Sequence, residues 1–565
     1  MTSDETTEGE FVICDALEKV YPDRSPRVWN DAIGLSAAIG ETVSFQVAYR
    51  PGAGESVHDL RPLRVRIEGG AEGHVRLYRV ELVPCELPAF HPHDDGYDRD
   101  APGLFPDLLE PMTDGELRPL VGGWRSVWFD FRVDDEAEAG LHSVTVVITD
   151  ADGSERFKRD IVVTVLPMRL PALDIVNSHW LHADAIADHY GVAVFGEEHW
   201  RLLDRFVASA AEMGVNSLLA PVWTPPLDTA VGHYRTPAQL VRVDELAPGE
   251  YRFDFTDLRR WLRLCESHGI RGVEVAHLFT QWGAEKTPAV YADGPDGSKR
   301  IFGWDVPATD PRYRAFLNQL LPQLCAVLDR ERRPEEIVFH VSDEPHGREQ
   351  LASYLAAKAV VSDLLAGRRI VDALSDYEYY ASGAVPIPVV ATDALTPFLA
   401  ERPDELWAYY CVGQHRDVAN RFMSMPSARN RVIGHQLFAF GLAGFLHWGF
   451  NFYYSWNSLR LIDPFRDTCS GGAFLGGDPF VVYPGSDGHP WPSIRHRVFA
   501  QAMADHRAMQ ALRGRDGMAA VAEIIDPDGS LRFDSYSVDP EHYLSARERI
   551  NARLASTPNK HKEYR

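Results

Sequence analysis

The stretch Glu336-Ile337-Val338-Phe339-His340-Val341-Ser342-Asp343-Glu344-Pro345-His346 lies near the middle of the chain and organises everything around it. Its β-branched and aromatic residues favour a buried strand, and the proline ends that strand. Two adjacent carboxylates then follow an apolar segment, where charges must be solvated or paired. Two interpretations are open at this point. The pair could serve acid–base chemistry in a cleft, or it could cap the helix that follows the strand.

Around this stretch, residues 172–515 repeat a rhythm of strand, loop and helix. Eight segments are predicted as strands: 174–179, 216–222, 272–279, 336–341, 369–374, 387–391, 405–411 and 444–452. Apolar residues at helical spacing predict helices over 200–213, 258–268 and 313–328. Eight such units predict a (β/α)8 TIM-type barrel with insertions. The alternative, an open doubly wound sheet, lacks a glycine-rich phosphate loop after its first strand.

The segments on either side of the barrel differ from it in pattern. Residues 1–168 alternate apolar and polar positions, as in 42–49, 63–67 and 142–148, and Asp152-Gly153 is a hairpin signal. These features predict an N-terminal β-sandwich, joined through the proline-rich linker 166–171. Residues 516–565 form a short C-terminal extension, with a strand predicted over 519–525 and a helix over 540–554. The predicted fold is therefore multidomain, α/β plus all-β.

The net charge of -25 restricts the partners of this chain. Nucleic acids and anionic membrane surfaces require basic patches, so neither is expected as a partner. No apolar run is long enough to span a membrane. The expected partner is a glycan or glycoside, and a homo-oligomer is possible.

The cysteines and the first residues indicate a compartment. The six cysteines are scattered without paired spacing, which predicts reduced, mostly buried thiols. The stretch 1–10 is acidic and polar, without the basic and apolar regions of a secretory signal. We therefore expect a cytoplasmic protein.

In a barrel of this type the chemistry is expected at the carboxyl ends of the strands. Trp, Tyr, His and Asp gather at those ends, a mixture that suits sugars because aromatic faces stack on C–H surfaces while polar groups bind hydroxyls. Any one aromatic could instead belong to the core. Besides Asp343 and Glu344, the candidate substrate-binding residues are His179, His182, Asp184, Trp223, Asp228, Gln281, Trp282, Asp376, Asp393, Trp407, Tyr409, Trp448, Tyr453 and Trp456.

Metal and serine chemistry are less well supported. His179 and His182 are three residues apart, and no cysteine or carboxylate cluster completes a ligand set. Their alternative role is hydrogen bonding to substrate or to loop backbone. Ser342 lies beside Asp343 without a nucleophile-elbow pattern. We expect no metal and no cofactor.

The run His340-Val341-Ser342-Asp343-Glu344-Pro345 resembles the Asp-Glu signature of glycoside hydrolase family 123, also known as domain-of-unknown-function family 4091. Supporting stretches are Gly214-Val215-Asn216, Pro225-Pro226-Leu227-Asp228-Thr229, Trp407-Ala408-Tyr409-Tyr410 and Gly476-Gly477-Asp478-Pro479-Phe480-Val481-Val482-Tyr483-Pro484-Gly485. The resemblance covers about residues 172–515, and that family also has a β-sandwich before its barrel.

This resemblance implies a retaining β-N-acetylgalactosaminidase-like enzyme that is assisted by its substrate. The residue matching Glu344 acts first as general acid and then as base. The residue matching Asp343 orients and stabilises the 2-acetamido group, whose oxygen attacks the anomeric carbon. No nucleophile from the enzyme is needed.

The residues themselves agree with this implication in one respect. Ordinary retaining glycosidases hold two carboxyl groups about 5–5.5 Å apart across the sugar bond. The seventh predicted strand ends in Tyr409-Tyr410-Cys411, and its one carboxylate, Glu405, stands at the opposite end. A carboxylate nucleophile is therefore missing at this strand end, as substrate assistance predicts. Two alternatives stay open: a conventional two-carboxylate glycosidase that uses Asp393 on a sugar without N-acetyl, and a non-catalytic carbohydrate-binding protein.

Overall fold

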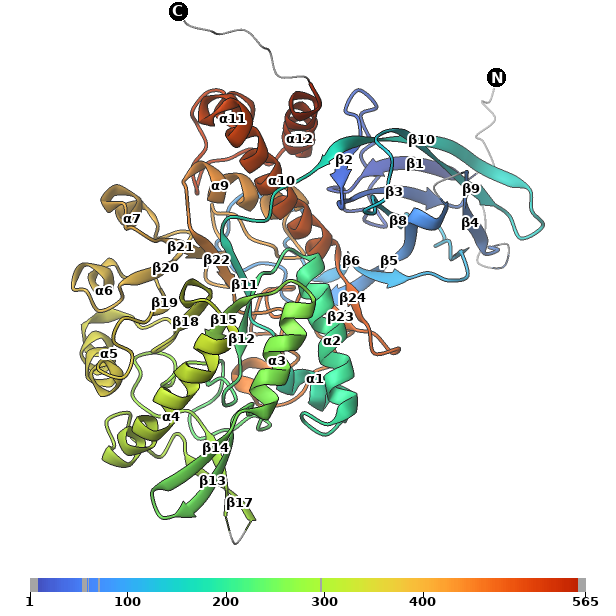
Figure 1. Cartoon of the computed structure of the whole chain (residues 1–565). Coiled ribbons are helices and arrows are strands. Elements are labelled where there is room, and N and C mark those ends of the chain that lie inside the picture. The colour runs from blue at the N-terminus through green and yellow to red at the C-terminus, as the bar shows by residue number, and fades with distance from the viewer. Residues whose placement is uncertain (1–8, 53–57, 59, 70–71, 295–296, 557–565) are drawn as a thin grey trace, which may run out of the picture.

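The structure is a computed structural model that describes residues 9–52, 58, 60–69, 72–294 and 297–556. Eight parallel strands follow one another around a barrel, and helices surround them (Figure 1). The strands are β11 (Val176–His179), β12 (Ser217–Ala220), β15 (Gly272–Val275), β18 (Ile337–Phe339), β19 (Val371–Leu374), β20 (Ile387–Ala391), β21 (Trp407–Tyr409) and β22 (Gly444–His447). Each lies within a predicted strand segment, so the TIM-type barrel is confirmed, in a nearly closed form.

The barrel has a seam between β18 and β19, the two ends of the eight-stranded sheet. Among the described residues, a single bridge between Phe339 and Ile370 connects these strands. Past that bridge, the side chain of Asp372 takes the place of a backbone carbonyl from β19 as hydrogen-bond acceptor. Its Oδ1 accepts the N–H groups of Val341 at 2.9 Å and Ser342 at 3.3 Å. A carboxylate therefore fixes the segment that leads from β18 to the two catalytic candidates.

The connections between barrel strands are mainly helical. The helices predicted over 200–213, 258–268 and 313–328 correspond to α2 (Glu197–Glu212), α3 (Thr256–Ser267) and α4 (Pro311–Glu331), and the first two predictions each run one residue too far. The helices are α1 (Ala183–Tyr190), α2 (Glu197–Glu212), α3 (Thr256–Ser267), α4 (Pro311–Glu331), α5 (Gly347–Val361), α6 (Tyr377–Ala381), α7 (Thr396–Glu401), α8 (Ser427–Arg431), α9 (Ile433–Ala439) and α10 (Ile494–Asp516). Short strands β13 (Arg242–Ala247), β14 (Glu250–Asp254), β16 (Val290–Gly294), β17 (Gly297–Phe302), β23 (Val482–Pro484) and β24 (Pro490–Pro492) occupy the insertions. No helix in the described ranges is both long and apolar enough to cross a membrane.

The N-terminal region consists of two five-stranded sheets, ordered β1-β3-β8-β5-β6 and β2-β10-β9-β4-β7. Their strands are β1 (Glu10–Asp15), β2 (Ser36–Ile39), β3 (Thr42–Arg50), β4 (Leu63–Glu68), β5 (Val75–Cys85), β6 (Gly103–Pro111), β7 (Glu116–Leu117), β8 (Arg125–Arg132), β9 (Gly140–Thr149) and β10 (Glu155–Arg169). All pairings are antiparallel except that of β2 with β10. Residues of both sheets, such as Phe45 and Val146, share one apolar cluster. The predicted hairpin at Asp152-Gly153 joins β9 to β10.

The C-terminal extension is helical, and one prediction for it is wrong. Residues 519–525 lie within α11 (Met518–Ile525) and do not form a strand. A short apolar run does not distinguish a buried helix from a buried strand, and here the run packs on α10. The predicted helix over 540–554 is confirmed as α12 (Pro540–Ala555). In Figure 1, α12 and part of α10 lie beside the N-terminal sheets.

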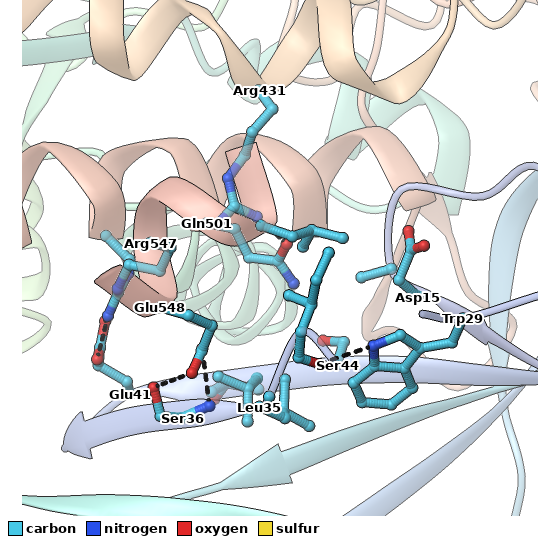
Figure 2. Close-up of a pocket in the computed structure, with 17 residues that line it drawn as sticks. Asp15, Trp29, Leu35, Ser36, Glu41, Ser44, Arg431, Gln501, Arg547 and Glu548 are labelled. Atoms are coloured by element: carbon cyan, nitrogen blue, oxygen red, sulfur yellow. Dashed lines mark hydrogen bonds and ion pairs between the residues drawn. The ribbon is translucent and has the colours of Figure 1, made fainter. Parts of the chain in front are cut away.

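Buried ion pairs connect these three parts of the chain. Asp505 in α10 accepts hydrogen bonds from Arg431 of α8 at 2.8 Å and from Arg547 of α12 at 3.2 Å. Arg547 also donates to both oxygens of Glu41, at 2.8 and 2.6 Å, in the turn between β2 and β3. Figure 2 shows Glu41, Arg431 and Arg547 around a cavity of about 50 Å³ at this junction. We call Glu41, Arg431, Asp505 and Arg547 the junction network.

Candidate active site

A cavity of about 180 Å³ opens at the carboxyl ends of the barrel strands. Side chains within or after β11, β12, β15, β18, β19, β21 and β22 meet there. Its lining residues are Trp180, Leu227, Asp228, Gln281, Trp282, Asp343, Glu344, Ala373, Tyr409, Cys411, Val412, Leu446, Trp448, Trp456, Phe474 and Asp478. Aromatic and apolar surfaces with a few polar groups are the usual composition of a small-molecule site.

The turn that carries Asp343 and Glu344 is held by backbone contacts on both sides. The N–H of Glu344 donates to the carbonyl of Ala373 in β19 at 3.1 Å, and the carbonyl of Asp343 accepts the N–H of Trp282 at 2.9 Å. Glu344 has a φ of +44°, a conformation that a non-glycine residue adopts at some cost and that is frequent at functional sites. Helix α5 begins after His346, and its N-cap has no side-chain hydrogen bond, so the pair does not cap that helix.

The two carboxyl groups have different surroundings. Tyr409 donates its hydroxyl hydrogen bond to Oε1 of Glu344 at 2.6 Å, and the Cys411 thiol lies 3.8 Å from the same oxygen. Within the described ranges no hydrogen-bond partner is found for the Asp343 carboxylate. Burial raises the pKa of Glu344, and burial together with the charge of Glu344 raises the pKa of Asp343 well above its ordinary value. Asp343 is therefore free to accept a hydrogen bond from a ligand.

The cavity is acidic and lacks cations. Four of its lining residues are Asp228, Asp343, Glu344 and Asp478, and none of the described lining residues is Lys or Arg. Burial raises the pKa of Asp228 and that of Asp478 to about 7 each. Carboxyl groups that are enclosed without a cation favour the protonated form, which is the property that a general acid needs near neutral pH.

Beneath the turn lies a buried charged group that we call the support network: Glu274, His340 and Asp372. Nε2 of His340 is 3.2 Å from Glu274, and its Nδ1 is 3.6 Å from Asp372. Burial opposes a charged imidazole, but the two carboxylates outweigh it and raise the pKa of His340 to about 9. Glu274 also accepts the indole N–H of Trp180 at 3.0 Å, which connects this network to the cavity wall.

Two partly exposed tryptophans stand at the mouth of the cavity. Trp282 is 42% exposed and Trp456 is 51% exposed, whereas Trp180 is buried. Contacts around Asp228 hold the loops that carry them: its N–H donates to Gln281 at 2.6 Å, and its carboxylate accepts the N–H of Asn457 at 3.0 Å. Exposed aromatic surface on fixed loops is characteristic of binding sites.

The cavity contains half of the residues predicted for the site: Asp228, Gln281, Trp282, Asp343, Glu344, Tyr409, Trp448 and Trp456. Three others lie behind the wall near β11. His179 accepts a hydrogen bond from Arg421 at 3.1 Å, and His182 accepts one from Arg235 at 3.0 Å. Asp184 forms a buried ion pair with Arg235 at 2.7 Å. These side chains have protein partners and are outside the cavity lining.

The remaining five predicted residues also lie outside the lining, for local reasons. Trp223, Trp407 and Tyr453 are buried, and their polar atoms donate to His277, Glu405 and Val482 respectively. Asp376 caps α6 by accepting the N–H of Glu378 at 3.0 Å. Asp393 is exposed and accepts from Gln414 at 3.1 Å.

Sequence reasoning missed several lining residues. Trp180 directly follows the first predicted strand, and Cys411 is the last residue of the seventh, so their position at strand ends was the available signal. Phe474 and Asp478 come from the long loop after β22. No strand or motif marks Phe474, whereas Asp478 belongs to the stretch 476–485 that resembles the family, and that was its available signal. Asp478 is fully buried, and its carboxylate accepts the indole N–H of Trp448 at 3.1 Å.

Comparisons with known proteins identify the family and the fold of this chain. The family model described as "Glycoside hydrolase 123, catalytic domain" matches residues 180–512, more than half of the chain. A solved family 123 glycoside hydrolase from Clostridium perfringens has a TM-score of 0.72 at 14% identity, over 97% of this chain and 98% of that one. A Bacteroides ovatus GH5 xyloglucanase reaches a TM-score of 0.33 at 8% identity, over 85% and 99% of the two chains, too low to support an argument. No curated protein matches the sequence.

Proposed function

This chain belongs to glycoside hydrolase family 123 and is a glycosidase, and from that premise we propose that it is a retaining β-N-acetylgalactosaminidase whose substrate assists the reaction. The observation that carries the proposal is the pair Asp343 and Glu344. Both line one cavity that no described lysine or arginine enters. The similar enzyme from Clostridium perfringens is described as acting on glycolipid glycans, which is consistent with a terminal sugar as substrate.

In the proposed mechanism Glu344 gives its proton to the glycosidic oxygen as the leaving group departs. Enclosure raises its pKa, which supports an acid that is still protonated near neutral pH. The acetamido oxygen of the substrate forms a bond to the anomeric carbon, and Asp343 accepts the acetamido N–H. Water then attacks the anomeric carbon while Glu344 takes back a proton, so the sugar is released with its configuration retained.

The two carboxyl groups share one proton in this scheme. Both have raised pKa values because they are enclosed, and the charge of Glu344 further opposes ionisation of Asp343. The proposed mechanism places that proton on Glu344 when substrate is bound, because the acetamido N–H then stabilises the charge on Asp343. The hydroxyl of Tyr409, 2.6 Å from Glu344, supports the ionised form that appears after proton transfer.

A conventional two-carboxylate mechanism has one observation in its favour. Asp478 lines the same cavity and could act as a nucleophile, whereas Asp393, the partner considered from the sequence, is exposed outside the lining. Against that role, Asp478 is fully buried and holds the indole of Trp448. We therefore favour substrate assistance.

The test compares two chromogenic substrates, the 4-nitrophenyl β-glycosides of N-acetylgalactosamine and of galactose. We expect hydrolysis of the first, little of the second, and competitive inhibition by the thiazoline analogue of N-acetylgalactosamine. Hydrolysis of galactosides alone would reject the proposal. Labelling of Asp478 by a 2-fluoro-galactosyl fluoride would instead identify the conventional mechanism.

Several finer predictions remain proposals beside this one. We infer that the two N-terminal sheets, which share an apolar cluster, form a sandwich that supports the barrel. The boundaries 1–168, 172–515 and 516–565, the cytoplasmic location and a homo-oligomer stay predictions from the sequence. Residues 1–8, on which the location depends, lie outside the described residues.

A further inference from the structure

Two buried thiols meet where the N-terminal sheets contact the wall of the cavity. Cys85 is the last residue of β5, and Cys469 belongs to the loop after β22, 384 positions later. Their sulfur atoms are 4.0 Å apart, and both residues are 1% exposed. All six cysteines of the chain are free. This contact therefore brings together two thiols from distant parts of the sequence and from different parts of the fold.

The backbone around the two thiols fixes their approach. The hydroxyl of Thr468 donates to the carbonyl of Pro84 at 2.7 Å, and the N–H of Gly476 donates to the carbonyl of Leu87 at 3.0 Å. Only glycine fits at position 476, because a Cβ there would lie 2.3 Å from the sulfur of Cys85. The two chain segments thus run side by side on both sides of the sulfur pair.

The same loop forms part of the cavity. Phe474 and Asp478 line it, and Ser470 accepts the N–H of Trp456, the tryptophan at the mouth, at 2.9 Å. A covalent link at Cys469 would therefore join the N-terminal sheets to the loop that shapes the site.

The surroundings of Cys469 favour its thiolate. Its sulfur accepts the N–H of Leu87 at 3.3 Å and lies 4.0 Å from the Cys85 thiol, which can donate to it. Because the hydrogen bond from Cys85 outweighs burial, the pKa of Cys469 is lowered to about 7, while the pKa of Cys85 is raised. A thiolate beside a protonated thiol is the arrangement of an attacking and a resolving cysteine.

We propose that Cys85 and Cys469 are a disulfide-forming pair that covalently joins the N-terminal sheets to the cavity loop. The oxidant is a low-molecular-weight disulfide. The Cys469 thiolate attacks one of its sulfurs and releases one thiolate; Cys85 then loses its proton and attacks Cys469 in the mixed disulfide, releasing the second. Two protein thiols and one small disulfide become one protein disulfide and two small thiols. The sulfurs must approach from 4.0 Å to about 2.05 Å.

The test incubates the full chain, natively folded, with glutathione disulfide, and a parallel sample with dithiothreitol. After acid quenching, denaturation and alkylation, peptides are mapped without reduction. We expect one linked peptide pair, Cys85 with Cys469, and alkylated Cys265 and Cys325. We also expect the oxidised protein to melt several degrees higher than the reduced one, because a link that closes so long a loop restricts the unfolded chain.

Variants separate this link from a general effect of oxidation. Cys85→Ser and Cys469→Ser should each abolish the oxidant-dependent rise in melting temperature, while Cys265→Ser, at a buried position in α3, should keep it. Peptide mapping of the wild type does not depend on how the variants fold. Glutathione bound to Cys411 or Cys469 without the linked pair would overturn the proposal, and so would a rise in melting temperature that persists in Cys85→Ser. None of these results depends on the sugar specificity proposed above.

Discussion

Two groups of acids in this molecule have opposite surroundings. In the junction network, Glu41 and Asp505 each contact an arginine from another part of the chain. In the cavity, Asp343 and Glu344 meet no cation from the described lining. Burial acts on both groups, but the arginines around Asp505 outweigh it and lower its pKa, whereas burial prevails in the cavity and raises the pKa of the pair. Paired acids hold parts of a fold together, and unpaired acids are available for proton transfer.

The largest expected effect is on catalysis, from Glu344→Gln. Removing the general acid should lower kcat by about 10²–10⁴-fold, which corresponds to about 3–5 kcal/mol of transition-state stabilisation. A disaccharide substrate should show the larger loss, since a 4-nitrophenyl leaving group needs less protonation. Steady-state kinetics on both substrates measures the difference. A variant that retains wild-type kcat on the disaccharide would place the acid elsewhere.

The pH dependence of kcat/KM sharpens the same contrast. Because the pKa of Glu344 is raised, its acid form persists to higher pH than an ordinary glutamate allows, and activity should fall as pH rises through that value. In Glu344→Gln this alkaline limb should vanish.

Asp505 should affect the pH dependence of folding stability in the opposite way. Its pKa is lowered in the folded protein, so its contribution to folding is present above the unfolded value of about 3.9 and is lost as pH falls below that value.

In the junction network, Asp505→Asn should cost about 3–5 kcal/mol of unfolding free energy, because it leaves two buried arginines without their shared anion. Urea unfolding, followed by tryptophan fluorescence, gives the difference. Arg159→Gln provides the matched control, since its 3.3 Å pair with Asp31 is exposed and should contribute under about 1 kcal/mol. If both variants lost the same unfolding free energy, buried and surface ion pairs would not differ in their contribution to stability.

Asp372→Asn tests whether the support network positions the catalytic turn. Its carboxylate holds the N–H groups of Val341 and Ser342, and an amide would replace one acceptor with a donor. We expect kcat to fall by about 10–100-fold with KM changed little, as a small displacement of a catalytic group produces. Tyr354→Phe, which removes only the 2.5 Å hydroxyl contact to Asp372, should change kcat much less. Reduced stability with an unchanged kcat would limit Asp372 to a structural role.

The smallest expected effect is a gain in stability. At a pH above the raised pKa of Glu344, its ionised form is less favourable in the cavity than in the unfolded chain. Glu344→Gln removes that charge and should raise the unfolding free energy by about 1 kcal/mol or less, since the side chain is partly exposed. Calorimetry at two pH values detects the change, which should shrink at the lower pH. Destabilisation by the variant would mean that the cavity stabilises the carboxylate.

The barrel could be predicted from the sequence because its strands are short apolar runs between helices, each with a clear period. The strand predicted at 519–525 failed, because a short, mostly apolar run beside α10 satisfies either structure and tertiary packing decides between them. The hairpin at Asp152-Gly153 succeeded, because its turn chemistry is local. Predictions that rested on local signals were therefore confirmed, whereas the prediction for the segment whose structure depends on distant packing was wrong.

The site was only partly predictable, for the same reason. The position of Asp343 and Glu344 after a strand predicted that they lie in the cavity, but His179 and Asp184 satisfy the same rule and are paired with arginines from distant loops. Glu274 lies between Val273 and Val275 in a buried strand, and such an isolated acid was a usable signal. Asp478 belongs to the stretch 476–485 that resembles the family, but it does not directly follow a barrel strand, so the strand-end rule did not point to it.

The contact of Arg547 with Glu41 spans 506 positions of the chain, and this has a consequence for biosynthesis. The N-terminal sheets can collapse early on the ribosome, because their strands pair within the first 169 residues. The surface that they present to α12 stays uncovered until translation reaches the last helix. Every nascent chain must therefore carry an unmatched Glu41 for most of its synthesis, and premature termination before residue 547 leaves that acid permanently without its cation.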